Sequence, residues 1–416
     1  MKLFKSSLLA LALASATTAN AESIAITNAT VHTVTEQGVL TNATVVIDDG
    51  KITAINPENV TADVVVNAEG KVLTPGLIGS MNQLGLVEVS AVSRSRDASD
   101  KKADITFDPS SAFNPRSSAI AYTRKGGITS NIVAPRGGES IFKGLAFVAD
   151  LSGEFDSIVS NGNAVIVDLG AQSKGSRAMS LQKLYRELED AQKKLAKAEK
   201  DKKSDDDKAD EKEPKRDEAI INALLAGEQT LVAYADRATD LLALIDMKAK
   251  FNLDLVVAGA GDAVLIADKL AKAEVPVVMS AMSNLPSSFD TLHQSLNNAA
   301  ILTNAGVKVL LTVSGDTHNL YQLRFDAGNA VANGMTKAQA LAAVTANVAD
   351  TFDINGGRIA VGKRADLVLW SSDPFELSTK VEQMWINGKL YTTESRHDAL
   401  RERYMAKSDM PRAYTK

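Results

Sequence analysis

The sequence predicts an α/β protein with a parallel sheet and a second, smaller all-β unit. Two observations carry this prediction. In the middle of the chain, apolar runs of strand length alternate with helical stretches, a pattern typical of βα units joined into a parallel sheet. At both ends of the chain, short β segments follow one another with turn signals between them. We therefore expect a central α/β unit and a small unit built from N- and C-terminal strands.

The β segments at the two ends are predicted to meet in one domain. Asp49-Gly50 and Asn387-Gly388 are hairpin signals between apolar runs. Strands at each end would expose open edges if they stayed apart, so we expect one small β-sandwich composed of residues 22–73 and 351–395, followed by a tail at 396–416. The strands expected in it are 24–34, 43–55, 64–72, 358–361, 365–370 and 380–391.

The central unit, residues 74–350, contains the βα pattern. Seven strands can be placed, and an eighth is irregular and expected within 145–150. Helices are expected at 236–250, 262–273, 289–305, 320–332 and 337–350. The seven strands are 76–81, 129–134, 164–169, 230–235, 253–258, 275–281 and 307–313.

A charged insertion at 180–217 interrupts this rhythm. Apolar residues from Leu181 to Ala198 recur at spacings of three and four, which predicts one amphipathic helix over 181–200. Residues 201–217 are almost all charged, with mixed sign, and predict a solvated, mobile loop. A surface insertion and a partner-binding arm both fit this pattern.

Residues 1–21 have the pattern of a secretory signal peptide. Lys2 and Lys5 precede an apolar run at 8–14, and small residues end the segment at Ala21. The run is too short to span a membrane, and no other apolar run is long enough. We therefore expect export to the periplasm and no membrane span.

Composition excludes several classes of function. A net charge of -5 argues against a nucleic-acid partner. The chain has no cysteine, which excludes disulfides, thiolate metal sites and a cysteine nucleophile. It has four histidines, so a metal centre built from several of them is nearly ruled out by number alone. These four are His32, His293, His318 and His397.

The stretch VLTPGLIGSMNQLGLV at 72–87 resembles the amidohydrolase superfamily. The first barrel strand of that superfamily usually reads PGLID, one further residue, then His, any residue, His. The matching positions here hold Gly79, Met81 and Gln83. GKRADLVLW at 362–370 is similar to its C-terminal phrase, and the likeness is greatest to the imidazolonepropionase-like branch. The resemblance implies a (β/α)8 TIM-like barrel beside the composite β-sandwich.

The resemblance also implies a zinc centre. In this sequence other residues stand at the positions of its histidine ligands. Residues two apart on a strand face the same side, so a His pair at 81 and 83 would point into the barrel mouth. A thioether is a soft ligand and an amide oxygen a weak one, so we expect Met81 and Gln83 to pack the mouth instead. Tyr234 and Gly259 stand at two further histidine positions. We predict no metal ligands, and a zinc cofactor only if activity is retained.

Asp316, in VKVLLTVSGDTHN at 307–319, matches the family's general base at the end of the last strand. We name Asp316 and His318 as candidate catalytic residues. Three alternatives stay open: a weak metal site of Asp316, His318 and Asp236, a Ser314/Asp316/His318 triad, and a role for His318 in bracing the loop.

Candidate ligand-binding residues are Arg237, Tyr234 and Gln83. Arg237, beside Asp236, either forms a local ion pair or anchors an anionic ligand. Arg136 is a further charged residue near a strand end. No dinucleotide fingerprint or Walker lysine accompanies the glycine pairs, so a phosphate cradle is not expected.

Three functional hypotheses follow. The resemblance implies a hydrolase of carbon–nitrogen bonds in small or cyclic amides. The replaced ligands favour a barrel that has kept its pocket and lost this chemistry, serving as a periplasmic binding or scaffold protein. A metal-independent lyase or hydrolase is the third. A small-molecule ligand fits all three, and nothing in the sequence decides between a monomer and a homo-oligomer.

Overall fold

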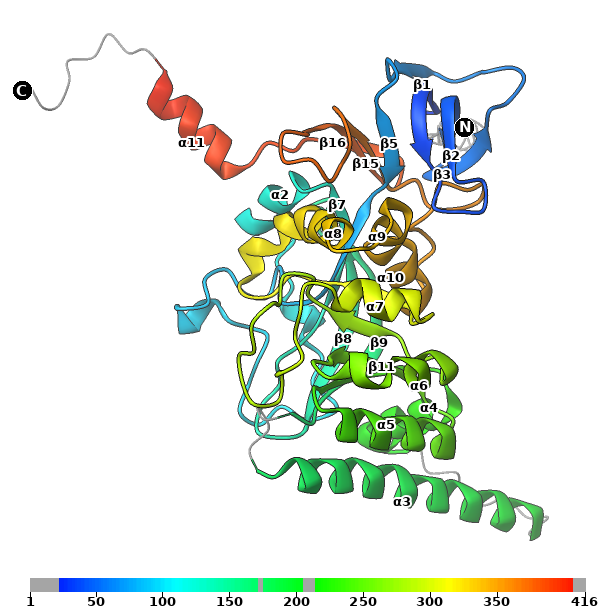
Figure 1. The fold of residues 1–416 in the computed structure, drawn as a ribbon, viewed down its shortest axis with the longest axis vertical. Helices are drawn as coiled ribbons and strands as arrows, with labels where there is room; N and C mark the ends of the chain where they lie inside the picture. Colours follow the sequence, from blue (N-terminus) through cyan, green and yellow to red (C-terminus); the bar gives the residue numbers. More distant parts are fainter. Residues whose placement is uncertain (1–21, 171–174, 205–213, 407–416) are drawn as a thin grey trace, which may run out of the picture.

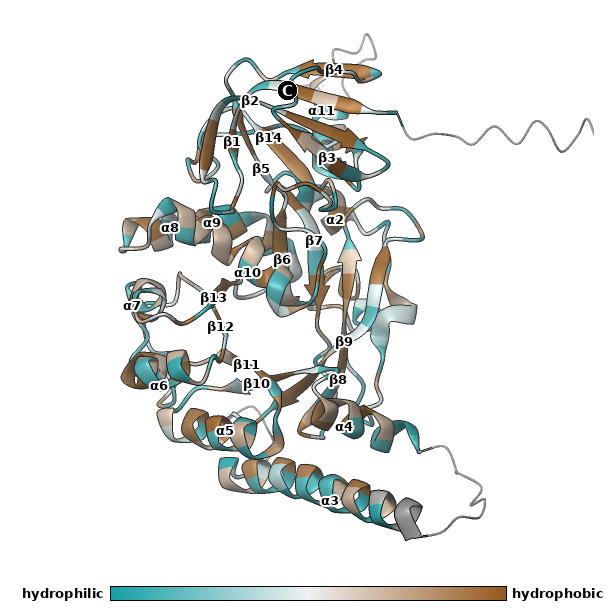
Figure 2. Ribbon diagram, turned by 90° about the vertical axis from the view of Figure 1, so that its right-hand side faces the viewer, coloured by the Kyte–Doolittle hydropathy of each residue, from teal (hydrophilic) through white to brown (hydrophobic). Residues whose placement is uncertain are grey.

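The computed structural model describes residues 22–170, 175–204 and 214–406. The predicted signal peptide at 1–21 and part of the predicted charged loop lie outside the described residues. Two eight-stranded sheets organise the chain, one in a barrel and one at the chain ends (Figure 1). Figure 2 shows the terminal sheet stacked on one end of the barrel.

The terminal sheet joins both ends of the chain, which confirms the predicted composite unit. Its strands form one hydrogen-bonded sheet, in the order β16-β15-β14-β5-β1-β2-β3, with β4 paired to β1. The junction is the antiparallel β5–β14 pair, in which Val72 faces Trp370. The strands are β1 (Ile24–His32), β2 (Val39–Asp48), β3 (Lys51–Ile55), β4 (Val64–Asn67), β5 (Val72–Pro75), β14 (Leu367–Trp370), β15 (Val381–Ile386) and β16 (Lys389–Tyr391).

This sheet has its own core, which includes Ile26, Ile47, Leu73 and Trp385. The strand predicted at 358–361 does not form. Instead, Ile359 is fully buried in the same core, and its backbone N–H donates to the Thr33 carbonyl. The apolar pattern at 358–361 therefore reflects burial of the segment and not pairing as a strand.

The barrel sheet runs in the order β13-β12-β11-β10-β9-β8-β7-β6. It nearly closes, because the Thr312 hydroxyl donates to the Ser80 carbonyl at 2.6 Å, between the two outer strands. All seven predicted strands are present. The strands are β6 (Leu77–Asn82), β7 (Ile128–Val133), β8 (Phe142–Asp150), β9 (Ile158–Asp168), β10 (Thr230–Ala235), β11 (Asp254–Gly259), β12 (Val277–Met279) and β13 (Val309–Leu311).

The irregular eighth strand is β8, and it departs from a strict (β/α)8 repeat. It contains the predicted 145–150 segment but pairs antiparallel with both β7 and β9. The connections at 134–141 and 151–157 explain this, because a parallel crossover needs about a dozen residues or more. No helix therefore separates β7, β8 and β9.

Helices cover the outside of the barrel, and a last helix, α11, lies near the C-terminus (Figure 1). The helix predicted at 289–305 is shorter, because only 298–304 is helical. The helices are α2 (Ser118–Arg124), α3 (Arg177–Ser204), α4 (Arg216–Ala226), α5 (Ala238–Phe251), α6 (Ala267–Lys272), α7 (Asn298–Asn304), α8 (Leu323–Ala332), α9 (Lys337–Ala343), α10 (Ala346–Thr351) and α11 (Arg396–Met405). In the described ranges, no helix is both long and apolar enough to cross a membrane.

The predicted amphipathic helix is α3, and it packs on the barrel's helical layer. Leu184 and Leu188 are buried, and the Tyr185 ring meets Phe251 of α5 edge-on at 5.4 Å. The predicted loop at 201–217 is too long, because its first residues continue α3 and Arg216 begins α4.

The barrel interior is apolar at one end. Val232, Val256, Val278 and Leu310 come from four neighbouring strands and form one internal cluster, which Phe352, next to α10, joins. Their sequence neighbours face outward and pack under the helices. The opposite end, where the parallel strands finish, is left for a site.

Candidate functional site

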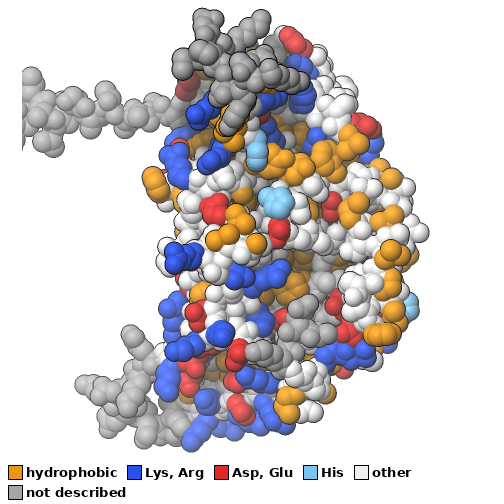
Figure 3. Space-filling view, turned by 90° about the vertical axis from the view of Figure 1, so that its left-hand side faces the viewer, with side chains coloured by type: hydrophobic (Ala, Val, Ile, Leu, Met, Phe, Trp, Pro, Cys, Tyr) orange, Lys and Arg blue, Asp and Glu red, His pale blue; other side chains and the backbone are white. Residues whose placement is uncertain are grey.

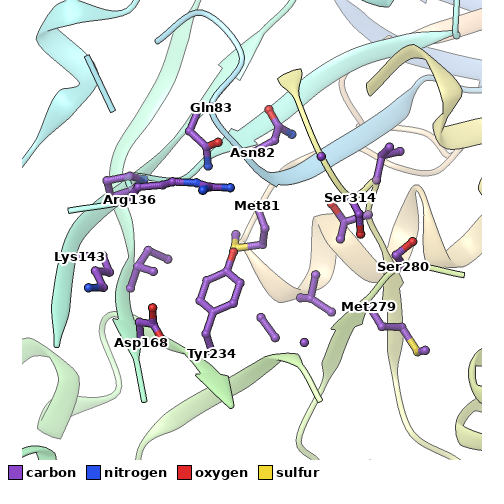
Figure 4. A pocket seen from close by; sticks show the side chains of 18 of the residues that line it. Met81, Asn82, Gln83, Arg136, Lys143, Asp168, Tyr234, Met279, Ser280 and Ser314 are labelled. Atoms are coloured by element: carbon purple, nitrogen blue, oxygen red, sulfur yellow. The ribbon is translucent and has the colours of Figure 1, made fainter. Parts of the chain in front are cut away.

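A cavity of about 560 Å³ opens at the carboxyl ends of the parallel strands (Figure 4). This volume is in the range of small-molecule sites. Every parallel strand except β7 contributes a lining residue within its own span or just after it, and the loop after β7 contributes three. The polar lining residues are Asn82, Gln83, Arg136, Lys143, Asp168, Tyr234, Ser280, Ser283, Gln294, Thr312 and Ser314.

The end of β6 supplies three consecutive lining residues, Met81, Asn82 and Gln83. Simple alternation predicts only the first and third. The backbone departs from the strand at Met81, where φ is 55°, and the β6–β7 register shifts between Gly79 and Asn82. Met81 and Gln83 both lie at the barrel mouth as expected, but Asn82 lies there too, so a bulge and not regular alternation places them.

Asn82 is fixed by a buried amide pair. Its side-chain N–H donates to Asn131 Oδ1 at 2.7 Å, and the Asn131 amide donates back at 3.0 Å. The same pair explains why Gly79 stands where the family pattern has Asp. A Cβ at Gly79 would lie 2.6 Å from Asn131 Oδ1 and 2.9 Å from Leu320 Cδ2, so a larger side chain would displace Asn131 and Leu320 from their present positions.

Tyr234 extends from the end of β10 into the cavity, with its hydroxyl directed toward Met81 (Figure 4). Burial raises the pKa of the Tyr234 phenol to about 12, with the Arg136 charge opposing this shift and Asp168 adding to it. At neutral pH the phenol is therefore uncharged, and it can both donate and accept a hydrogen bond.

Three ionisable side chains besides Tyr234 line the cavity. Arg136 reaches across it from the loop after β7 (Figure 4). Among the described residues, no ion pair includes its guanidinium. The Lys143 ammonium, on the antiparallel strand β8, donates to the Gly138 and Ser140 carbonyls at 3.1 and 2.9 Å. Asp168 is the one lining carboxylate. Two cations against one anion leave a positive cavity that favours an anionic ligand.

The sequence contained a signal for one of these residues. Ala164 and Ile166 of β9 face the barrel interior, so the next inward position is Asp168. Lys143 gave no such signal, because its strand is antiparallel and its facing could not be assigned from a βα pattern.

The positions that would hold zinc in the family pattern do not suit that ion. Met81, Gln83 and Tyr234 offer a thioether, an amide and a neutral phenol, and Gly259 offers no side chain. A Cβ at Gly259 would lie 2.8 Å from Asp236 Oδ1. Within residues 22–170, 175–204 and 214–406, no group of three His, Asp or Glu side chains is placed to bind a metal.

Asp316 and His318 are exposed and lie beyond the cavity lining, which reaches Gly315. The Ser90 hydroxyl donates to Asp316 Oδ1 at 2.5 Å. No hydrogen bond in the described chain links Ser314, Asp316 and His318 as a triad. The alternative metal site of Asp236, Asp316 and His318 does not form. A catalytic role for Asp316 or His318 stays a prediction.

Arg237 pairs with Asp290 and is not a lining residue. Arg177 at the start of α3 joins the same cluster, 2.7 Å from Asp290 and 3.0 Å from Asp240. The local ion pair expected for Arg237 is thus present, and a role of Arg237 in ligand binding stays a prediction. Of the three candidate ligand-binding residues, Tyr234 and Gln83 line the cavity.

A buried carboxyl lies behind the cavity wall. Asp326 of α8 is 5% exposed, and the Ser280 hydroxyl donates to its Oδ2 at 3.4 Å. Burial raises the pKa of Asp326 to about 7, with the Ser280 bond opposing the shift. Ser280 itself lines the cavity, so this carboxyl is one side chain removed from any ligand.

Comparison with known proteins agrees with this fold. The model of the amidohydrolase family matches residues 217–391. No curated protein sequence matches the chain. The fold, a nearly closed eight-stranded barrel beside a sheet of N- and C-terminal strands, is the composite fold of amidohydrolases.

Solved structures show the same fold. An amidohydrolase from Thermotoga maritima MSB8 is 24% identical with a TM-score of 0.79, covering 89% of this chain and 99% of its own. A β-aspartyl dipeptidase from Fervidobacterium islandicum AW-1, in complex with β-Asp-Leu dipeptide, is 13% identical with a TM-score of 0.55, covering 89% and 96%. A prolidase complexed with N-methylphosphonate-L-proline is 15% identical with a TM-score of 0.52, covering 89% and 99%.

Proposed function

We propose that this chain is a member of the amidohydrolase superfamily that binds a small anionic molecule in its barrel mouth without a hydrolytic zinc ion. The observation that carries the proposal is the cavity itself. It holds Arg136 and Lys143 against the single carboxylate of Asp168, and its zinc positions offer no suitable donor set.

A carboxylate is the anion that these groups suit best. The Arg136 guanidinium presents a planar fork that can bind two carboxylate oxygens together. Tyr234, as a neutral phenol, and Gln83, as an amide beside Arg136, add polar groups to the same cavity (Figure 4). The ligands of the two relatives above, β-Asp-Leu dipeptide and N-methylphosphonate-L-proline, carry negatively charged groups and support this choice.

A hydrolase of carbon–nitrogen bonds is the second candidate. It is favoured by the family match and by a carboxylate, Asp316, just past the end of β13. In that case Asp316 would act as general base, and it would need to release Ser90 to reach water in the cavity.

We also propose export to the periplasm through residues 1–21. N-terminal sequencing of the mature protein from a fractionated bacterial host tests this proposal. A mature chain beginning after Ala21 in the periplasmic fraction is expected, and an intact N-terminus in the cytoplasm would contradict it.

Calorimetric titration of the full mature chain tests the binding function. N-acetylglycine, a small anionic amide, is expected to bind, and the neutral amide N-methylacetamide is not. Arg136→Gln should weaken N-acetylglycine about tenfold, the effect of losing one charge-assisted contact. Arg237→Gln is the comparison variant, because its guanidinium already pairs with Asp290.

The same preparation distinguishes the second candidate. Metal content by mass spectrometry and amine release from N-acetylglycine and small cyclic amides are measured with and without added zinc. Binding with less than one metal ion per chain and no amine release supports the proposal. Stoichiometric zinc with turnover would establish the hydrolase, and loss of binding in Arg237→Gln but not Arg136→Gln would move the ligand to the Arg237 side.

A further inference from the structure

The loop between β12 and α7 rises from the cavity and returns to it. Ser280 and Ser283 near its start line the cavity, as does Gln294 near its end. The backbone N–H of Met282 donates to the Ser280 hydroxyl at 3.2 Å, which holds the departing chain at the cavity edge. Residues between these points therefore belong to a loop whose two ends lie at the mouth.

Four large apolar side chains of this loop face solvent. Leu285 and Phe289 are 78% and 86% exposed, and Met282 and Leu292 are 50% and 56% exposed. Exposed apolar residues scattered singly are ordinary, but a group beside a ligand cavity marks a binding surface.

Polar contacts hold this loop in place. Asp290, only 7% exposed, binds the guanidinium groups of Arg177 and Arg237. The Thr291 hydroxyl accepts from the backbone N–H groups of Ser287 and Ser288, each at 3.1 Å. Phe289 lies between these anchors, and Leu285 and Leu292 flank them, so a braced segment carries the exposed side chains.

A second loop brings apolar side chains to the same mouth. Val89 and Val92, after β6, are 52% and 49% exposed. Ser90 between them donates to Asp316, next to the cavity-lining Gly315. We call these six side chains the apolar rim: Val89, Val92, Met282, Leu285, Phe289 and Leu292. Figure 3 shows the side of the molecule that lies on the left in Figure 1, where orange hydrophobic side chains reach the surface beside blue Lys and Arg.

We propose that the ligand is amphiphilic, with its anionic head in the cavity beside Arg136 and Lys143 and an apolar chain lying on the apolar rim. This inference rests on the proposed function and specifies its ligand class. The two parts adjoin, because Ser280, Ser283 and Gln294 belong to the cavity while four of the six rim residues lie between them in sequence. A short polar ligand would leave the rim bare, whereas a chain of several methylene groups would cover it.

A chain-length series tests the proposal. N-acetylglycine and N-octanoylglycine share one head group, and both are titrated into the full mature chain below their micellar concentrations. N-octanoylglycine is expected to bind at least tenfold more tightly. The double variant Leu285→Ser/Phe289→Ser should lose this gain and keep the affinity for N-acetylglycine within about twofold, which also shows that it is folded.

Leu377→Ser/Leu390→Ser is the matched control. These leucines are 76% and 61% exposed, and they lie outside the rim, in the loop after β14 and in β16. The control should retain the full gain. Equal affinities for both acylglycines, or the same loss in the control, would overturn the inference while binding of N-acetylglycine leaves the proposed function standing. Failure of both compounds to bind would overturn the proposed function itself.

A membrane arm completes the test, because an apolar rim with nearby cations could instead meet a lipid surface. Co-sedimentation uses vesicles of phosphatidylglycerol and phosphatidylcholine. No binding is expected. Vesicle binding that Leu285→Ser/Phe289→Ser abolishes, together with no chain-length effect, would replace the small amphiphile with a membrane surface.

Discussion

Two groups of charged side chains lie around the carboxyl ends of the barrel strands, and they differ in how their charges are matched. Arg177, Arg237, Asp240 and Asp290 form a cluster with two cations and two carboxylates, joined by ion pairs. Arg136 and Lys143 line the cavity with one carboxylate, Asp168, and no ion pair in the described chain joins the three.

This difference suits the ion-paired cluster to stabilising the fold and the cavity charges to binding a ligand. A charge that already has a counterion gains little from a ligand, and its removal leaves a partner unpaired. A charge that faces a cavity without a counterion can be neutralised by whatever enters. Asp326 shows a third outcome. Within the described part of the chain no cation pairs with this buried carboxyl, and it lowers the cost of its burial by staying protonated up to about pH 7.

Asp326→Asn should have the largest effect on stability. The unfolded carboxyl titrates near pH 4, whereas burial raises the folded pKa to about 7. Between these values the unfolded state releases its proton while the folded state keeps it, so stability falls as pH rises through this window and stays lower above it. Asn removes this penalty. We expect a gain of up to about 4 kcal/mol at pH 8 and little change at pH 4, by urea denaturation.

Asp246→Asn is the control for this measurement, because Asp246 is exposed on α5. It should change stability little at either pH. An equal effect of Asp326→Asn at pH 4 and pH 8 would show that the carboxyl is not protonated in the folded protein.

Asp290→Asn should destabilise the fold by about 2 kcal/mol, because it leaves two guanidinium groups without their shared carboxylate. The loss stays below that of a fully buried pair, since the Arg177 and Arg237 side chains are 27% and 40% exposed. Urea denaturation at pH 7 measures it.

Asp350→Asn gives the matched control on a more exposed pair. Arg358 binds Asp350 through two contacts of 2.6 Å, and this surface pair should contribute less than about 1 kcal/mol. If both variants lose the same stability, the Asp290 cluster is no more than an ordinary surface pair and the comparison fails.

Asp168→Asn should have the smallest effect on stability. It should strengthen ligand binding, whereas Arg136→Gln should weaken it. Asn keeps an oxygen that can accept from the Gly170 N–H, now 3.1 Å from Asp168 Oδ1. Removing the one lining carboxylate leaves both cations unopposed, so N-acetylglycine should bind about fivefold more tightly. Calorimetry at two salt concentrations measures the gain, which should shrink as salt rises. Weaker binding would show that Asp168 itself contacts the ligand.

Much of the fold could be predicted from apolar patterning. The strands around Val232 and Val256 are buried on both faces and stand out as apolar runs. The (β/α)8 expectation missed the direction of β8, because a short connection and not the strand's own sequence makes it antiparallel. The 201–217 loop was overextended, since charged residues also continue and begin exposed helices such as α3 and α4.

The candidate site was predictable in part. Met81, Gln83 and Tyr234 line the cavity as their strand-end positions indicated, and Asp168 could have been added from the inward row of β9. Asp316 and Arg237 follow strands too, yet Asp316 accepts from Ser90 and Arg237 pairs with Asp290. Position after a strand places a residue near the mouth, and local partners then decide whether it faces the cavity.

The sequence by itself determined the two-part fold and the residue types at the positions that match the superfamily's histidines. It could do so because periodicity and residue type are local properties, and neither a thioether nor a missing side chain changes with the fold. Only the tertiary structure decided which charges are matched. Lys143 arrives on an antiparallel strand and Asp290 meets Arg177 from α3, so their environments depend on segments far away in the chain.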